Sequence, residues 1–99
     1  MTDNANENAP GLDPIAEKIL ELLAASEPNS SLSPQQIAQA VADARRRPND
    51  PPDLWRRYLP AVKQQALHLA RAGKLIVMRK GKEVDAQTAK GVIRYKRPI

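Results

Sequence analysis

Prolines stand at positions in this sequence where a helix has to begin. Asp13 precedes Pro14, and a proline in the first turn costs a helix little because its missing N–H would have no intrahelical partner there. Ser33 precedes Pro34, and Gln36 follows three residues after the serine, which is the pattern of a capping box. The sequence therefore predicts one helix that begins at Pro14 and a second that begins at Pro34.

Apolar side chains recur at helical spacing after both starts. The first stripe consists of Ile15, Ile19, Leu22 and Leu23. This first helix is expected to end near Ala25. The second stripe is narrower and consists of Ile37, Ala38 and Val41. The second helix runs into three arginines at 45–47, whose positive charges suit a helix C-terminus.

More prolines interrupt the chain before a third helix. The three prolines between 48 and 52 predict a stiff surface loop. Asp53 is then expected to cap a short turn that holds the only tryptophan, Trp55. Because the ring of Pro60 would clash with the carbonyl of Arg56 in one unbroken helix, we predict a break or kink at Pro60.

The third helix is predicted to run from Pro60 to Ala72. Its spacing places Val62, Ala66 and Leu69 inward. Gly73 follows as the left-handed residue that ends the helix.

Two apolar runs after the third helix predict strands, over 75–78 and 92–95. Residues 80–82 read as a turn, and residues 83–91 are expected to be too polar to pack and to form a long hairpin loop. Alternation along the second strand places two side chains on one face, Ile93 and Tyr95.

Three helices followed by a strand, a basic hairpin and a closing strand resemble a winged helix-turn-helix domain of the α+β class, with a two-stranded wing. The segment 69–76 is similar to the junction between the third helix and the wing in such domains. Ser31–Ser33 lies where those folds place a short third strand. Residues 13–99 are predicted to form this domain. Residues 1–12 have no apolar periodicity, so we expect a disordered N-terminal arm.

Four segments of the chain carry a narrower resemblance. They read W-R-x-x-L-P-A-V over 55–62, R-A-G-K-L-I over 71–76, R-K-G-K-E-V-D over 79–85 and A-K-G-V-I-R over 89–94. From Ile15 onward the chain is similar to a family of short bacterial proteins called domain of unknown function 3253. The resemblance implies a fold like a winged helix. The family has no settled activity, so the resemblance supplies no catalytic or binding residues.

Reactive side chains are scarce in this sequence. It has no cysteine and one histidine, His68, and it shows neither a glycine-rich phosphate loop nor metal-ligand spacing. We therefore expect no enzyme, no cofactor, no metal site and no small-molecule substrate. The chain has no secretory signal and no apolar run of the ~18 residues that a membrane helix needs, so a cytoplasmic protein with no membrane partner is expected.

Charge is distributed unequally along the chain. Residues 1–43 contain seven acidic residues and one lysine, whereas residues 44–99 contain fifteen lysines and arginines and four acidic residues. This asymmetry indicates one basic end that faces a polyanion and one acidic end. A solvated, charged surface without a partner is the simpler interpretation of the same pattern.

The third helix is the candidate element for reading nucleic acid. If its apolar stripe is buried, Gln64, His68 and Arg71 point outward, and Lys63 lies on the flank. Glutamine can pair with adenine and arginine with guanine in a major groove. The hairpin adds five candidate phosphate-binding cations, which are Arg79, Lys80, Lys82, Lys90 and Arg94. We therefore predict binding to nucleic acid, with duplex DNA as the first candidate.

Three alternatives remain open at this point. Lysines on exposed strands also prevent edge-to-edge pairing, so the basic hairpin does not require a nucleic acid. Leu67 lies off the buried stripe and either packs beneath the wing or contacts another protein. With the acidic first helix, it could make the domain a protein-interaction adaptor. Trp55 is predicted to be a buried anchor between the third helix and the first, with base stacking as the alternative.

Overall fold

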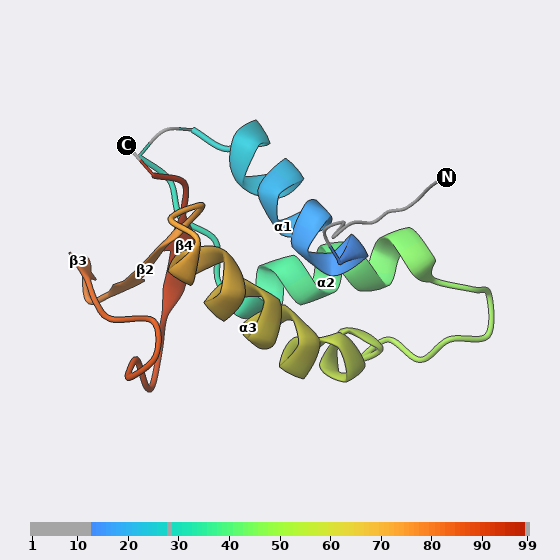
Figure 1. The fold of residues 1–99 in the computed structure, drawn as a ribbon. Helices are drawn as coiled ribbons and strands as arrows, with labels where there is room; N and C mark the ends of the chain where they lie inside the picture. The colour runs from blue at the N-terminus through green and yellow to red at the C-terminus, as the bar shows by residue number, and fades with distance from the viewer. Residues whose placement is uncertain (1–12, 28, 99) are drawn as a thin grey trace.

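The computed structural model describes residues 13–27 and 29–98, which form three helices and a small antiparallel sheet (Figure 1). The helices are α1 (Pro14–Ala25), α2 (Pro34–Arg45) and α3 (Trp55–Arg71), and the strands are β2 (Ile76–Arg79), β3 (Lys82–Glu83) and β4 (Arg94–Lys96). The predicted α+β winged-helix layout is confirmed. The arm predicted over 1–12 lies outside the described residues.

The first two helices begin where their caps predict. The Ile15 amide donates to Oδ1 of Asp13 at 2.7 Å. The Gln36 amide donates to Oγ of Ser33 at 3.1 Å, and the Ser33 amide donates to Oε1 of Gln36 at 2.8 Å, which completes the capping box. These bonds satisfy amides that have no partner inside a helix, and they fix the first turn of α1 and of α2.

Of the break or kink predicted at Pro60, the break is wrong, because α3 is one helix of 17 residues that begins at Trp55. Pro60 is its sixth residue, so the helix loses only the bond that the Arg56 carbonyl would accept. Both residues are exposed, and water can bond to that carbonyl instead. The predicted side-chain cap by Asp53 is also wrong: its main-chain carbonyl accepts the Arg56 amide at 3.0 Å, and α3 has no side-chain cap.

The sheet has three strands in the order β3-β2-β4, instead of the two-stranded hairpin that the sequence predicts. Lys80 and Gly81 both have positive φ angles, of 54° and 79°, and form a tight two-residue turn. The chain therefore reverses one residue earlier than predicted. Lys82 and Glu83, expected in the turn and the long loop, pair with β2 as β3.

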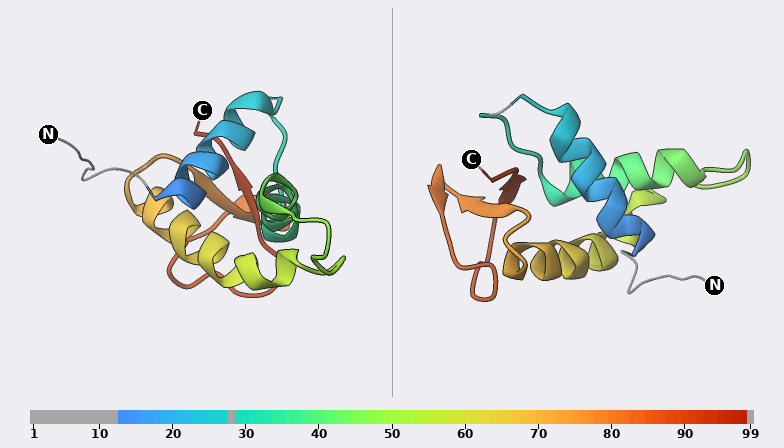
Figure 2. Two further views of the ribbon diagram at one scale, coloured as in Figure 1. Left: turned by 90° about the vertical axis from the view of Figure 1, so that its right-hand side faces the viewer. Right: turned by 45° about the horizontal axis from the view of Figure 1, so that its top comes forward.

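The last strand joins β2 to the connection between α1 and α2. Tyr95 lies opposite Val77 of β2. On its other side, the amides and carbonyls of Tyr95 and Leu32 exchange two hydrogen bonds of 2.8 Å each. Where a short third strand is expected near Ser31–Ser33, the structure has a bridge at the single residue Leu32. Figures 1 and 2 show the sheet at the end of the molecule where α3 ends, far from the loop that follows α2.

The core lies between the three helices and the inner face of the sheet. Val62, Ala66 and Leu69 are buried, as predicted for α3. Tyr95 is 2% exposed and is among the largest buried side chains. The predicted alternation along β4 is confirmed, because Arg94 is exposed on the other face.

Trp55 differs from its prediction. It is half-buried, whereas the preceding Leu54 is 4% exposed and occupies the buried position. The hollow beside the indole is lined by α2 residues, Pro34 and Gln35 among them, and by residues 91–93 instead of α1. The guanidinium of Arg56 lies 5.6 Å from the ring centroid. Trp55 is therefore a partly buried residue packed against the core instead of the fully buried anchor that the sequence predicts.

Replacing Pro60 with alanine tests whether α3 is continuous. In an unbroken helix Pro60→Ala restores one hydrogen bond and removes a steric clash, and the exposed proline ring leaves no cavity. The free energy of unfolding should therefore rise by roughly 1–2 kcal/mol, below the full penalty of a mid-helix proline. Urea denaturation measures the change. If the helix instead began at Pro60, the alanine variant would be equal to or less stable than the parent.

Alkaline unfolding tests the buried position of Tyr95. Burial raises the pKa of Tyr95 from 10.0 to about 12. The unfolded chain then ionises before the folded one, so the stabilisation is complete below pH 10 and is lost as the pH rises through about 12. Compared with Tyr95→Phe, the parent should lose up to about 2 kcal/mol more over this window. Equal losses in parent and variant would show that Tyr95 ionises in the fold as readily as in water.

Candidate nucleic-acid interface

The continuous helix places a row of polar side chains along the exposed face of α3. Arg57, Gln64, His68 and Arg71 are spaced by seven, four and three residues, so they share one side, and all four are exposed. The row spans about 21 Å at 1.5 Å per residue. We call these four residues the α3 row. Sequence reasoning missed Arg57 because it placed this residue in a separate turn before Pro60.

The α3 row is purely cationic and polar. The helix Trp55–Arg71 contains no aspartate or glutamate, and Lys63 is exposed on its flank. In the part of the chain that the structure describes, ion pairs join Lys18 to Glu21 at 3.1 Å and Arg46 to Asp43 at 3.5 Å, both away from α3. The helix therefore presents positive charge that these ion pairs do not neutralise.

The segment 84–93, between β3 and β4, lies along one flank of α3. Figures 1 and 2 show it descending from the sheet to the level of this helix. Ala86 and Ala89 pack partly buried against the core, so the prediction that this segment is too polar to pack is wrong. Between the segment and α3 is a hollow of about 310 Å³ with Leu67 in its lining. Leu67 is half-buried here, so it is open to this hollow on one side, and both of its predicted roles remain predictions.

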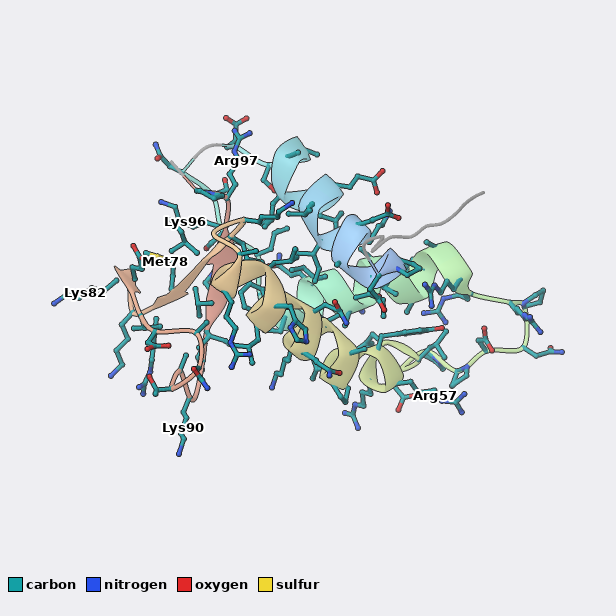
Figure 3. The ribbon with its side chains drawn as sticks, in the orientation of Figure 1. Arg57, Met78, Lys82, Lys90, Lys96 and Arg97 are labelled. Atoms are coloured by element: carbon teal, nitrogen blue, oxygen red, sulfur yellow. The ribbon has the colours of Figure 1, made fainter. Side chains whose placement is uncertain are left out.

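Two further cations flank this hollow. Lys63 lines it from α3 and Lys90 lines it from the opposite segment. The guanidinium of Arg79 lies over Gly91, the residue that follows Lys90 in the chain. A Cβ atom placed on Gly91 would lie 3.5 Å from Nη2 of Arg79. In Figure 3 the side chains of Lys90 and Arg57 both project from the lower side of the molecule. The structure thus brings six predicted residues to one side: Lys63, Gln64, His68, Arg71, Arg79 and Lys90.

Three predicted residues lie elsewhere. Lys80 and Arg94 line a separate hollow on the outer face of the sheet. Lys82 projects away from the domain at the edge of the sheet (Figure 3). The outward position of Arg94 follows from strand alternation, because its neighbour Tyr95 faces the core. Lys80 lies in the β2-β3 turn, and Lys82 pairs with Arg79 at the edge of the sheet.

Arg94 has a structural role, because its guanidinium forms hydrogen bonds to two residues that are distant in sequence. Its Nε donates to Oγ of Ser31 at 2.6 Å, and its Nη2 donates to the Ser31 carbonyl at 2.8 Å and to Oε1 of Gln36 at 3.4 Å. Since Gln36 also completes the capping box, Arg94 links β4 to the start of α2. Nothing in the sequence pairs residues so far apart, and the sequence analysis missed this role.

The exposed α3 face offers guanidinium, ammonium and amide groups, which are donors for phosphate oxygens and for base edges. Within residues 13–27 and 29–98, no three His, Asp or Glu side chains lie together as ligands for a metal ion. Among the helices described, none is both long and apolar enough to cross a membrane.

Comparison with known sequences places the chain in one family. No curated protein matches it. The family described as "Protein of unknown function (DUF3253)" matches residues 12–98, which include all three helices and the whole sheet. The match covers most of the chain and agrees with the resemblance found in the segments 55–62, 71–76, 79–85 and 89–94. The chain therefore belongs to the DUF3253 family.

Proposed function

We propose that this protein binds duplex DNA through the exposed face of α3 and the adjacent segment 84–93, without a chemical step. The α3 row carries the proposal: it is a line of donors along one face of a helix that has no acidic residue. An α-helix with its side chains is ~10–12 Å across, close to the ~12 Å width of the major groove. The row is also long enough to follow several base pairs.

The residues along the α3 row are expected to contact different parts of the duplex. Gln64 lies near the middle, where a side chain reaches base edges, and its amide can pair with adenine. Arg57 and Arg71 lie near the two ends of the row, where the groove walls bring phosphates close. Lys63 and Lys90 flank the hollow beside the helix and would contact the phosphates of one strand.

The acidic residues of α1 lie where they would not oppose this contact, whereas Asp85 lies in the segment 84–93 and, with Glu83, lines a hollow beside Arg71. Glu17 and Glu21 are exposed on α1, which lies above α3 in Figure 1, and Arg57 of the α3 row projects from the lower side of the molecule in Figure 3. A duplex would therefore be attracted to the basic side and repelled by the acidic one, which orients the encounter.

The adaptor alternative used Leu67, which is half-buried and lines the hollow between α3 and the segment 84–93. A protein contact on the α3 side would have to use the same cations that favour a nucleic acid. DNA is therefore the partner that this face fits best.

The salt dependence of binding tests the proposal. With three or four phosphate contacts from Arg57, Lys63, Arg71 and Lys90, the slope of log affinity against log salt should be about −3 to −4. Arg57→Ala should flatten the slope by about 1 and weaken all duplexes equally, because phosphate contacts carry no sequence information. Fluorescence anisotropy with labelled duplexes at several salt concentrations measures both. Lys82→Ala is the matched control, since this side chain points away from the α3 row, and it should change little.

Gln64→Ala separates reading of bases from contact with phosphates. It should leave the salt slope intact and reduce any preference among duplexes by about 1–3 kcal/mol.

Equal effects of Arg57→Ala and Lys82→Ala on the salt slope would contradict docking by α3. Dissociation constants weaker than about 1 mM at low salt would exclude DNA binding as the function, since ordinary non-specific binders reach about 10⁻⁴ M.

A further inference from the structure

A second hollow lies on the outer face of the sheet. Its volume is about 500 Å³, within the usual range of ligand sites. The lining comes from the connection between α1 and α2, the β2-β3 turn and the chain around β4. These residues are Asn29, Ser31, Met78, Lys80, Gly81, Val92, Arg94 and Lys96. We call this site the sheet hollow.

The sheet hollow is positively charged. Lys80, Arg94 and Lys96 line it, and its lining contains no acidic residue. Arg94 is held in place by the hydrogen bonds to Ser31 and Gln36, which use Nε and Nη2 and leave Nη1 out. A side chain already fixed in this way loses little entropy when it binds an anion. The charge and the fixed guanidinium favour a carboxylate or phosphate.

The apolar side chains at the sheet hollow favour a carboxylate of a protein segment over the phosphate of a nucleic acid. Val92 is 83% exposed, the one large apolar side chain so exposed in the part of the chain that the structure describes. It lines the sheet hollow beside half-buried Met78, and it also lines the hollow next to Trp55. A nucleic-acid backbone would leave these apolar surfaces wet. A protein segment can supply both a carboxylate and an apolar side chain that covers them.

The backbone at Lys80 points to the same site. Its φ of 54° lies in the left-handed region, where the first residue of such a turn is usually Asn, Asp or Gly. A lysine there is strained, because its Cβ lies close to the following carbonyl oxygen. Strained backbone of this kind tends to occur at functional positions. Here the strained residue places an ammonium group at the sheet hollow.

We propose that the sheet hollow binds an acidic segment of a partner protein that carries an apolar side chain. Carboxylates of the segment contact Lys80, Arg94 and Lys96, and the apolar side chain covers Val92 and Met78. The site shares no residue with the α3 row, and only Val92 belongs to the segment 84–93, so this inference does not depend on binding to DNA.

A synthetic probe tests the site. The probe is a fluorescein-labelled peptide with one leucine between short runs of glutamate, titrated with the full chain and followed by anisotropy. One comparison peptide has glycine in place of the leucine, and another has glutamine in place of each glutamate. Both should bind at least about threefold more weakly, since each lacks one of the two contacts.

Lys80→Asn separates binding from folding. Asparagine suits the left-handed turn, so thermal unfolding should occur at an equal or higher temperature, while the affinity for the peptide should fall about three- to tenfold. Lys82→Asn is the matched control: it removes the same charge two residues away on a side chain that points elsewhere. It should leave the affinity nearly unchanged. Val92→Ser should weaken the leucine peptide and leave the glycine peptide unaffected.

Three outcomes would overturn the inference. One is equal loss of affinity in Lys80→Asn and Lys82→Asn, which would indicate general attraction between charges. Another is equal binding of the leucine and glycine peptides. The third is displacement of the bound peptide by a short unlabelled duplex at matched ionic strength, which would assign the sheet hollow to nucleic acid. Failure of the duplex to bind at all would refute the proposed function and leave this inference intact.

Discussion

Tyr95 is the residue on which the rest of the structure depends. Its backbone exchanges two hydrogen bonds with Leu32, and it lies in register with Val77 of β2. Its ring lies in the core that all three helices share. One strand residue therefore joins the connection between α1 and α2, the sheet and the helical core, across more than sixty residues of sequence. Such a distant contact is costly in chain entropy, and burial of the large ring offsets that cost.

The buried ring also determines where the charges lie. Successive side chains of a strand face opposite sides, so an inward Tyr95 directs Arg94 and Lys96 outward. There they line the sheet hollow together with Lys80. The same packing places the segment 84–93 along the flank of α3 and leaves the α3 row exposed. The basic half of the sequence is thus divided between two surfaces, a division that net charge alone does not reveal.

Local signals predict local structure well in this chain. The caps at Asp13 and Ser33 predict the starts of α1 and α2, and the buried stripe of α3 follows from its spacing, because each depends on residues within one or two turns. The failure at Pro60 has a physical cause: the rule concerns one hydrogen bond, whereas the whole amphipathic helix is stabilised by burial of its inner face. Once α3 is continuous, spacing alone would have found Arg57.

Contacts between distant segments were beyond sequence reasoning. Nothing near Arg94 indicates that its guanidinium bonds to Ser31, and nothing near Leu67 indicates that it shares a hollow with the segment 84–93. The strand β3 was missed because two residues carry too little pattern, and its pairing depends on the tight turn that Lys80 enters despite its unfavourable φ. The prediction of which cations act together fails for the same reason. Cations that are close in the sequence of the hairpin do not all lie on one face of the fold.

The separation of the two basic surfaces is tested most directly by backbone amide NMR. A short duplex and the glutamate-leucine peptide are added in turn to one labelled sample, and the amide shifts are mapped onto the fold. The account predicts two sets that do not overlap: the duplex shifts amides of 57–71, and the peptide shifts those around Ser31 and Lys80. A single common set of shifted amides for both ligands would contradict it.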